Sequence, residues 1–67
     1  MTGTVKWFDD ESGYGYVAPD EGDADLFVHY THIKGSRVRS LERGDRVSYE
    51  PVRSRWGEEA RYVRKIE

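Results

Sequence analysis

Two short stretches of this sequence place flat side chains two residues apart. The first carries Tyr14 and Tyr16, and the second carries Phe27 and His29. Residues two apart in an extended chain project from the same face of a strand. The sequence therefore predicts two strands, each with one face that carries rings.

The opposite face of each predicted strand is aliphatic, with Val17 in the first and Leu26 and Val28 in the second. Aliphatic side chains account for a core, whereas a patch of exposed rings is unfavourable in water and needs its own explanation. Flat rings at base-stacking spacing, with glycine between them, are typical of a platform for single-stranded nucleic acid. The alternative is that the rings form the core of a two-sided sheet. The aliphatic faces favour the platform.

The length and composition limit the chain to one small domain, residues 1–67. A chain this short buries only about 60% of its unfolded surface, so we expect a single compact core. It has no cysteine, which excludes disulfides and thiolate metal sites and fits a reducing cytoplasm. Neither a signal peptide nor an apolar run long enough for a membrane helix is present in the sequence. We expect a cytoplasmic monomer without membrane association.

The charges are divided unevenly along the chain, although the net charge is only −2. Residues 1–33 contain one lysine against seven acids, and residues 34–67 contain ten lysines or arginines against six acids. We expect a bound strand to run across the rings toward the arginines, with stacking contributing more than charge. An ordinary solvated surface with uneven charge is the alternative.

The chain is predicted to be all-β, with short strands at residues 4–8, 14–18, 26–30, 45–52 and 60–65. Thr31–Gly35 resembles one helical turn, with Thr31 as a possible cap, and Leu41 is expected to anchor the connection that follows. Five strands without a long amphipathic helix favour a closed barrel, because an open sheet would leave its edges exposed.

Two positions do not fit a regular strand. Trp7 and Phe8 are adjacent and cannot both face inward, so either one is exposed or a bulge intervenes. Ala60 and Val63 are both expected in the core, which simple alternation does not allow. A bulge or twist would reconcile them.

The ring-bearing stretches match the paired ribonucleoprotein motifs, which also occur in RNA-recognition-motif domains. Those domains need two packing helices that this chain lacks. With Gly3–Phe8 in front and Leu26–Tyr30 behind, the chain resembles bacterial cold-shock proteins from end to end. The resemblance implies a five-stranded antiparallel OB-fold barrel that binds single-stranded RNA and DNA with little sequence preference.

The resemblance also implies a function and a binding surface. The function is that of a passive RNA chaperone without enzymatic activity or cofactor, which keeps RNA unpaired and influences transcription or translation, for example at low temperature. The matching surface residues are Lys6, Trp7, Phe8, Tyr14, Tyr16, Phe27, His29 and Tyr30. Base stacking would fall to Trp7, Tyr14, Phe27 and His29, with Tyr16 and Tyr30 flanking them. Lys6 would meet a phosphate, and Asp25 either accepts a hydrogen bond from a base or caps the preceding turn.

The sequence departs from the family pattern in four respects. Ser12 replaces a usual lysine, which removes one phosphate contact, and Val38 lies near a position that is often aromatic. Tyrosine replaces phenylalanine at three ring positions, which keeps the π-face and adds a hydroxyl. Trp56 is untypical of the last hairpin. It either folds onto the barrel or provides another stacking platform beside Arg55.

Two functions from other classes compete with this hypothesis. A metal or enzyme site could use His29 and His32 with Asp23 and Asp25, but a strand followed by a turn does not require the two imidazoles to converge. The second competing function is that of a barrel used for protein contacts alone. Metal analysis tests the first, and titration with nucleic acid tests the second.

Overall fold

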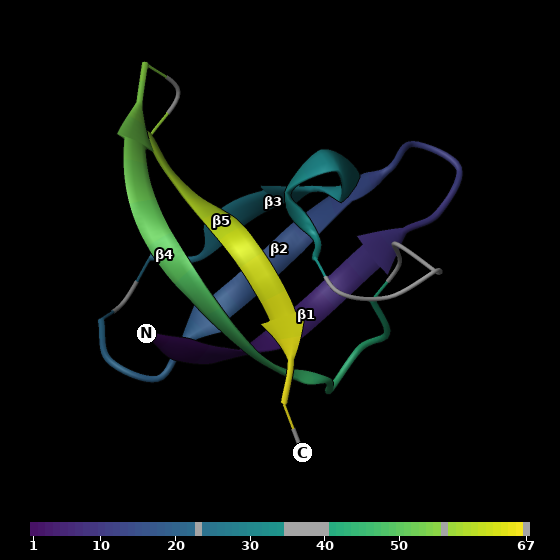
Figure 1. Ribbon diagram of the computed structural model, residues 1–67, viewed down its shortest axis with the longest axis horizontal. Helices are drawn as coiled ribbons and strands as arrows, with labels where there is room; N and C mark the ends of the chain where they lie inside the picture. The colour runs from purple at the N-terminus through teal and green to yellow at the C-terminus, as the bar shows by residue number, and fades with distance from the viewer. Residues whose placement is uncertain (23, 35–40, 56, 67) are drawn as a thin grey trace.

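The computed structural model describes residues 1–22, 24–34, 41–55 and 57–66. Its elements are β1 (Thr2–Asp9), β2 (Tyr14–Pro19), β3 (Leu26–His29), η1 (Tyr30–His32), β4 (Arg46–Ser54) and β5 (Gly57–Lys65). The strands close a barrel in the order β1-β2-β3-β5-β4, as Figure 1 shows. The predicted all-β, five-stranded barrel is confirmed. The predictions that concern Asp23, Gly35, Val38 and Trp56 lie outside the described residues.

One strand pairing in the barrel is parallel. Neighbouring strands are antiparallel in the pairs β1–β2, β1–β4, β2–β3 and β4–β5, whereas β3 and β5 run parallel, with Phe27 opposite Glu59. Strand direction cannot alternate all the way around a ring with an odd number of strands. A five-stranded barrel therefore includes a parallel pair even where the fold is antiparallel in type.

The core is built from the inner faces of the strands and two anchors from the connections. Its members are Val5, Val17, Leu26, Val28, Ile33, Leu41, Val47, Tyr49, Ala60 and Val63. The aliphatic faces predicted for β2 and β3 are buried, and Leu41 is the anchor expected in the long connection. Burying one large aliphatic side chain contributes about 1.5–3 kcal/mol, so this set stabilises the barrel without the rings on its outside.

A bulge in β1 separates its surface and core residues. The β1–β2 register shifts between Val5 and Trp7, so Lys6 is the extra residue. After the shift Trp7 faces solvent, while Phe8 is partly buried against the core. The two alternatives expected for these adjacent rings, an exposed ring or a bulge, therefore occur together, because the bulge turns Trp7 outward.

A second bulge in β5 explains how Ala60 and Val63 are both buried. Ser48 pairs with Arg64 and Glu50 with Arg61, so β5 has one residue more than β4 over this interval. Tyr62 occupies the irregular position with a positive φ of 53°. The predicted bulge in the last strand is confirmed.

The helical turn begins one residue earlier than predicted. His29, still extended, is the N-cap of η1, and its ring accepts a hydrogen bond from the Thr31 N–H. Thr31 lies inside the turn, so its prediction as the cap was wrong. The Tyr30 N–H still donates to the carbonyl of Gly13 (2.8 Å), in register with the β2–β3 pairing, and the chain turns directly after this bond.

Gly13 also leaves space for the Tyr30 ring, because it has no side chain. Its φ is +79°, and a Cβ added there would lie 2.7 Å from Cδ1 of Tyr30. Gly44 has a similarly strained φ of +93°, but no described atom lies within 4 Å of its added Cβ. The two glycines therefore share a backbone requirement and differ in what a side chain would displace.

We expect Gly13→Ala and Gly44→Ala each to lower the free energy of unfolding by about 1 kcal/mol, because alanine is disfavoured at positive φ. In Gly13→Ala alone, the new methyl should also push Tyr30 away from His29. Urea unfolding measures the first effect, and NMR contacts between the His29 and Tyr30 rings measure the second. Loss of those contacts in Gly44→Ala, or their retention in Gly13→Ala, would contradict this placement of Tyr30.

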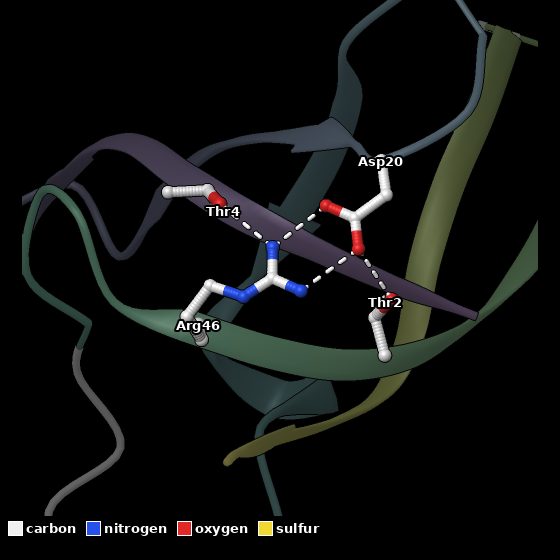
Figure 2. A network of polar contacts seen from close by, with 4 residues as sticks. All are labelled: Thr2, Thr4, Asp20 and Arg46. Carbon is white, nitrogen blue, oxygen red and sulfur yellow. Dashed lines mark hydrogen bonds and ion pairs between the residues drawn. The ribbon is translucent and has the colours of Figure 1, made fainter. Parts of the chain in front are cut away.

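A polar network joins three segments at the start of β1 (Figure 2). Arg46 Nη1 and Nη2 donate to the two carboxylate oxygens of Asp20 at 2.6 and 2.8 Å. Arg46 Nη1 also donates to Thr4 Oγ1 (3.0 Å), and Thr2 Oγ1 donates to Asp20 (2.6 Å). The Arg46 and Thr2 hydrogen bonds hold the pKa of Asp20 well below its usual range. The network thereby ties β4 and the end of β2 to β1.

Asp20→Asn should lower the thermal midpoint at neutral pH, because it removes the charge from this network. The depressed pKa of Asp20 means that its contribution is complete above the usual carboxyl range and is lost as the pH falls through the folded-state pKa. The midpoints of parent and variant should therefore converge in strong acid. Asp10→Asn is the control, since the Asp10 carboxylate has no ion-pair partner in the described chain. A difference that stays constant with pH would contradict the assignment.

Candidate nucleic-acid interface

Six rings form one continuous row on the outside of the barrel. They come from β1, β2, β3 and η1, and they are Trp7, Tyr14, Tyr16, Phe27, His29 and Tyr30. Each ring lies within contact range of at least one other, with centroid separations from 4.6 Å for His29–Tyr30 to 6.5 Å for Phe27–His29. The structure thus brings together six of the residues that the sequence predicted for the surface.

The row is open to solvent at its two ends. Trp7 and Tyr30 are each 43% exposed, and the four rings between them are partly buried against one another. None of the six belongs to the core cluster. The alternative in which the rings form the core of a two-sided sheet is therefore wrong, because the opposite faces already fill the interior.

Strand register explains why the rings meet. Tyr16 of β2 lies opposite Trp7 on one side and Phe27 on the other, and Tyr14 lies opposite His29. Cross-strand neighbours on one face are close enough for their side chains to touch. Rings from three strands therefore form one surface.

Gly15 allows β2 to approach β1 closely at this surface. A Cβ on Gly15 would overlap the backbone carbonyl of Trp7 and lie 2.7 Å from Cα of Phe8. The obstacle is backbone, which cannot rotate away as a flexible side chain can. Any residue larger than glycine would consequently separate the strands that carry Trp7 and the tyrosines.

The His29 ring is held in position by the turn that follows it. Its Nδ1 lies 2.9 Å from Oγ1 of Thr31 and accepts a longer bond, 3.4 Å, from the Thr31 N–H. The ring is close to parallel with Phe27, at an interplanar angle of 24°, and tilted by 39° from Tyr30. Both polar contacts restrict the orientation of a ring that stands between two others.

Lys6 and Asp25 form an ion pair beside the row. Lys6 Nζ lies 3.3 Å from the Asp25 carboxylate, and both side chains are solvent-accessible. No hydrogen bond from Asp25 to the preceding turn is present among the described residues, so its alternative role as a turn cap has no support. A phosphate approaching Lys6 would have to compete with Asp25.

Two other predicted site residues that the structure describes, Phe8 and Arg55, lie outside the ring row. Phe8 packs against the core from the far side of β1. Arg55 is exposed in the turn between β4 and β5, and Trp56 lies outside the described residues. Ser12 donates to the Asp9 carboxylate (3.0 Å), so it stabilises the β1–β2 turn. This bond, followed by that from the Glu11 N–H, lowers the pKa of Asp9.

Sequence reasoning missed an exposed pair on the neighbouring strand. Lys34 Nζ lies 5.7 Å from the ring centroid of Tyr62, whose side chain is exposed. The sequence contains no clear signal for it, because simple alternation puts Tyr62 on the same face as the core residue Ala60, and only the bulge in β5 turns it outward.

Two features typical of other functional classes are absent from the described part of the chain. It contains no cluster of three or more His, Cys, Asp or Glu side chains arranged to hold a metal ion. It contains no helix of the length and apolarity required to cross a membrane.

Comparisons with known proteins agree with this geometry. The family model of the "Cold-shock" DNA-binding domain matches residues 1–66. The chain is 52% identical over 64 residues to "Probable cold shock protein A" of Mycolicibacterium smegmatis, with 96% of each chain covered. It is 47% identical over 64 residues to "Cold shock protein CspB" of Geobacillus stearothermophilus, again with 96% of each chain covered.

A solved structure supports the fold independently. The chain "drosophila Unr CSD456" superposes with a TM-score of 0.81 over 98% of this chain and 26% of that one, at 20% sequence identity. This match confirms the predicted OB-type barrel, and the family model and the two relatives account for nearly the whole sequence. The chain therefore belongs to the cold-shock domain family.

Proposed function

We propose that this protein binds single-stranded RNA and DNA by stacking unpaired bases on the ring row. The observation that carries the proposal is the continuity of six surface rings across three strands and one turn. A family model described as a DNA-binding domain supports the class of ligand. The single strand is favoured over duplex because paired bases are stacked on one another and their faces are not available.

Stacking supplies most of the affinity in this proposal. One base on an aromatic side chain contributes roughly 1–3 kcal/mol by alanine substitution, and it does so with little dependence on sequence because every base has a π-face. Trp7, Tyr14, Phe27 and His29 take bases, while Tyr16 and Tyr30 support them from the sides. Phe8, which packs against the core, would support the strand that carries Trp7.

Charge contributes less than stacking to the affinity in this proposal. The net charge is −2, and the cation expected beside the rings, Lys6, is already paired with Asp25. Each phosphate that a protein neutralises on a single strand adds about 0.7 to the slope of affinity against salt concentration. Binding should therefore depend weakly on salt for a nucleic-acid-binding protein. Arg55, exposed in the turn between β4 and β5, is proposed as a further contact.

The action on RNA follows from binding alone. A protein that binds the unpaired state of a hairpin, and not the paired state, shifts the equilibrium toward the unpaired state by mass action. No hydrolysis, cofactor or metal is required. The protein is thus proposed to act as a monomeric, single-domain RNA chaperone in the cytoplasm, with effects on transcription or translation.

Phe27→Ala and His29→Ala should each weaken binding to a pyrimidine-rich single strand by at least about tenfold, the equivalent of one lost stacking contact. Isothermal titration calorimetry measures the affinity, and urea unfolding shows that each variant remains folded. Ile66→Ala is the control, because it removes an exposed apolar side chain outside the ring row. Unchanged affinity in both folded ring variants, or equal affinity of the parent for duplex and single strand, would refute the proposal.

A further inference from the structure

Tyr62 is an exposed ring that the ring row does not include. Its side chain is 57% exposed, and its backbone adopts φ 53° at the bulge of β5. The left-handed region is unfavourable for a residue with a Cβ and is occupied mainly by glycine or asparagine. The bulge that keeps Ala60 and Val63 buried accounts for this conformation, but the ring itself is not held by burial, since most of it faces solvent. Backbone strain at non-glycine residues clusters at functional sites.

A cation lies beside Tyr62, and the backbone holds it there. The Lys34 N–H donates to the carbonyl of Val63 (2.7 Å), and Ile33 forms a parallel bridge with Val63. The segment after η1 therefore runs along β5, which places Lys34 Nζ 5.7 Å from the Tyr62 ring. η1 and β5 pack side by side, and Figure 1 shows the teal turn and the yellow strand on the same part of the barrel.

A second cation, Arg61, precedes Tyr62, and not all of its N–H donors are hydrogen-bonded. Its guanidinium makes one long contact, 3.5 Å, to the Glu59 carboxylate, and its side chain is 39% exposed. Its Nε is buried and has no hydrogen-bond partner among the described residues. An arginine has five N–H donors, and an unpaired buried donor is costly, so the present contacts leave this group unsatisfied.

These residues adjoin the open end of the ring row. Tyr30, at that end, begins η1, and Lys34 comes two residues after η1, behind its C-cap Ile33. Half-buried His32 lies between them, and its pKa is lowered by burial and then by the nearby charge of Arg61, with a smaller effect of Lys34. Counting Glu59 as negative, the charged groups around η1 carry a net positive charge. A strand that leaves the row at Tyr30 would thus meet cations next.

We propose that Lys34, Arg61 and Tyr62 form a second contact patch for the same single strand, with the Tyr62 ring stacking on a base and the two cations meeting the adjoining phosphates. A bound strand then continues from Tyr30 over η1 onto β5, and the binding site is longer than the ring row. This inference rests on the proposed function, because it extends the strand bound there. Charge complementarity and continuity with the ring row favour nucleic acid as the occupant.

Oligothymidines of about 6 and about 10 nucleotides test the length of the site, since single OB folds bind about 4–16 nucleotides. The quantity to measure is the affinity for the longer oligothymidine divided by the affinity for the shorter one. Tyr62→Asn should lower this ratio at least about fivefold, because it removes one stacked base. Asparagine tolerates the backbone conformation, so this variant should fold at least as well as the parent. Tyr62→Phe keeps the ring and should restore the gain.

Lys34→Gln gives a second readout. For the longer oligonucleotide, the slope of log affinity against log salt concentration should fall by about 0.7, the value for one phosphate contact on a single strand. A folded Tyr62→Asn variant with the parent ratio, together with an unchanged slope in Lys34→Gln, would overturn the inference. If Phe27→Ala still weakens binding to both lengths in that case, the proposed function stands without the second patch. If Phe27→Ala has no effect either, the proposed function fails first.

Discussion

The structure depends on an interior filled from one face of every strand. Small aliphatic residues such as Val5, Val17 and Val28 are buried completely and leave no room inside for the rings on the opposite faces. In a chain of 67 residues the core cannot grow to absorb six more rings, so they stay outside. The exposed rings therefore follow from the way a small barrel must be packed. They cost stability in water, and the proposed binding of bases would offset that cost.

Two β-bulges determine which side chains face solvent in the ring row and on β5. In β1 the extra residue Lys6 turns Trp7 toward solvent and lets Phe8 pack on the core. In β5 the extra residue Tyr62 keeps Ala60 and Val63 inside and puts its own ring outside. Bulges re-aim side chains at functional surfaces. A β-bulge therefore explains the exposed ring in both places, Trp7 in the ring row and Tyr62 in the proposed patch on β5.

Much of the fold and of the row could be predicted because both rest on local alternation. Tyr14 and Tyr16 share a face in any extended strand, and so do Phe27 and His29. The rest depends on contacts between distant residues. Tyr30 bonds to Gly13 at the end of the β2–β3 pairing, Lys6 of β1 pairs with Asp25 just before β3, and Arg46 reaches Asp20 across 26 positions. The conformation of Tyr62 follows from the register between β4 and β5, which the sequence does not state.

The acidic composition of the chain is compatible with the proposed binding surface because several of the acids are engaged with partners in the described structure. Asp20, part of the acidic half of the sequence, is paired with Arg46 at the start of β1 (Figure 2). Asp9 is engaged with Ser12 in a turn. Asp9 lies opposite Tyr14, and Asp25 pairs with Lys6, so both acids adjoin the ring row. The proposed contact therefore relies on stacking more than on charge. A protein of net negative charge can therefore bind a polyanion where its rings, and a few cations beside them, form the contact.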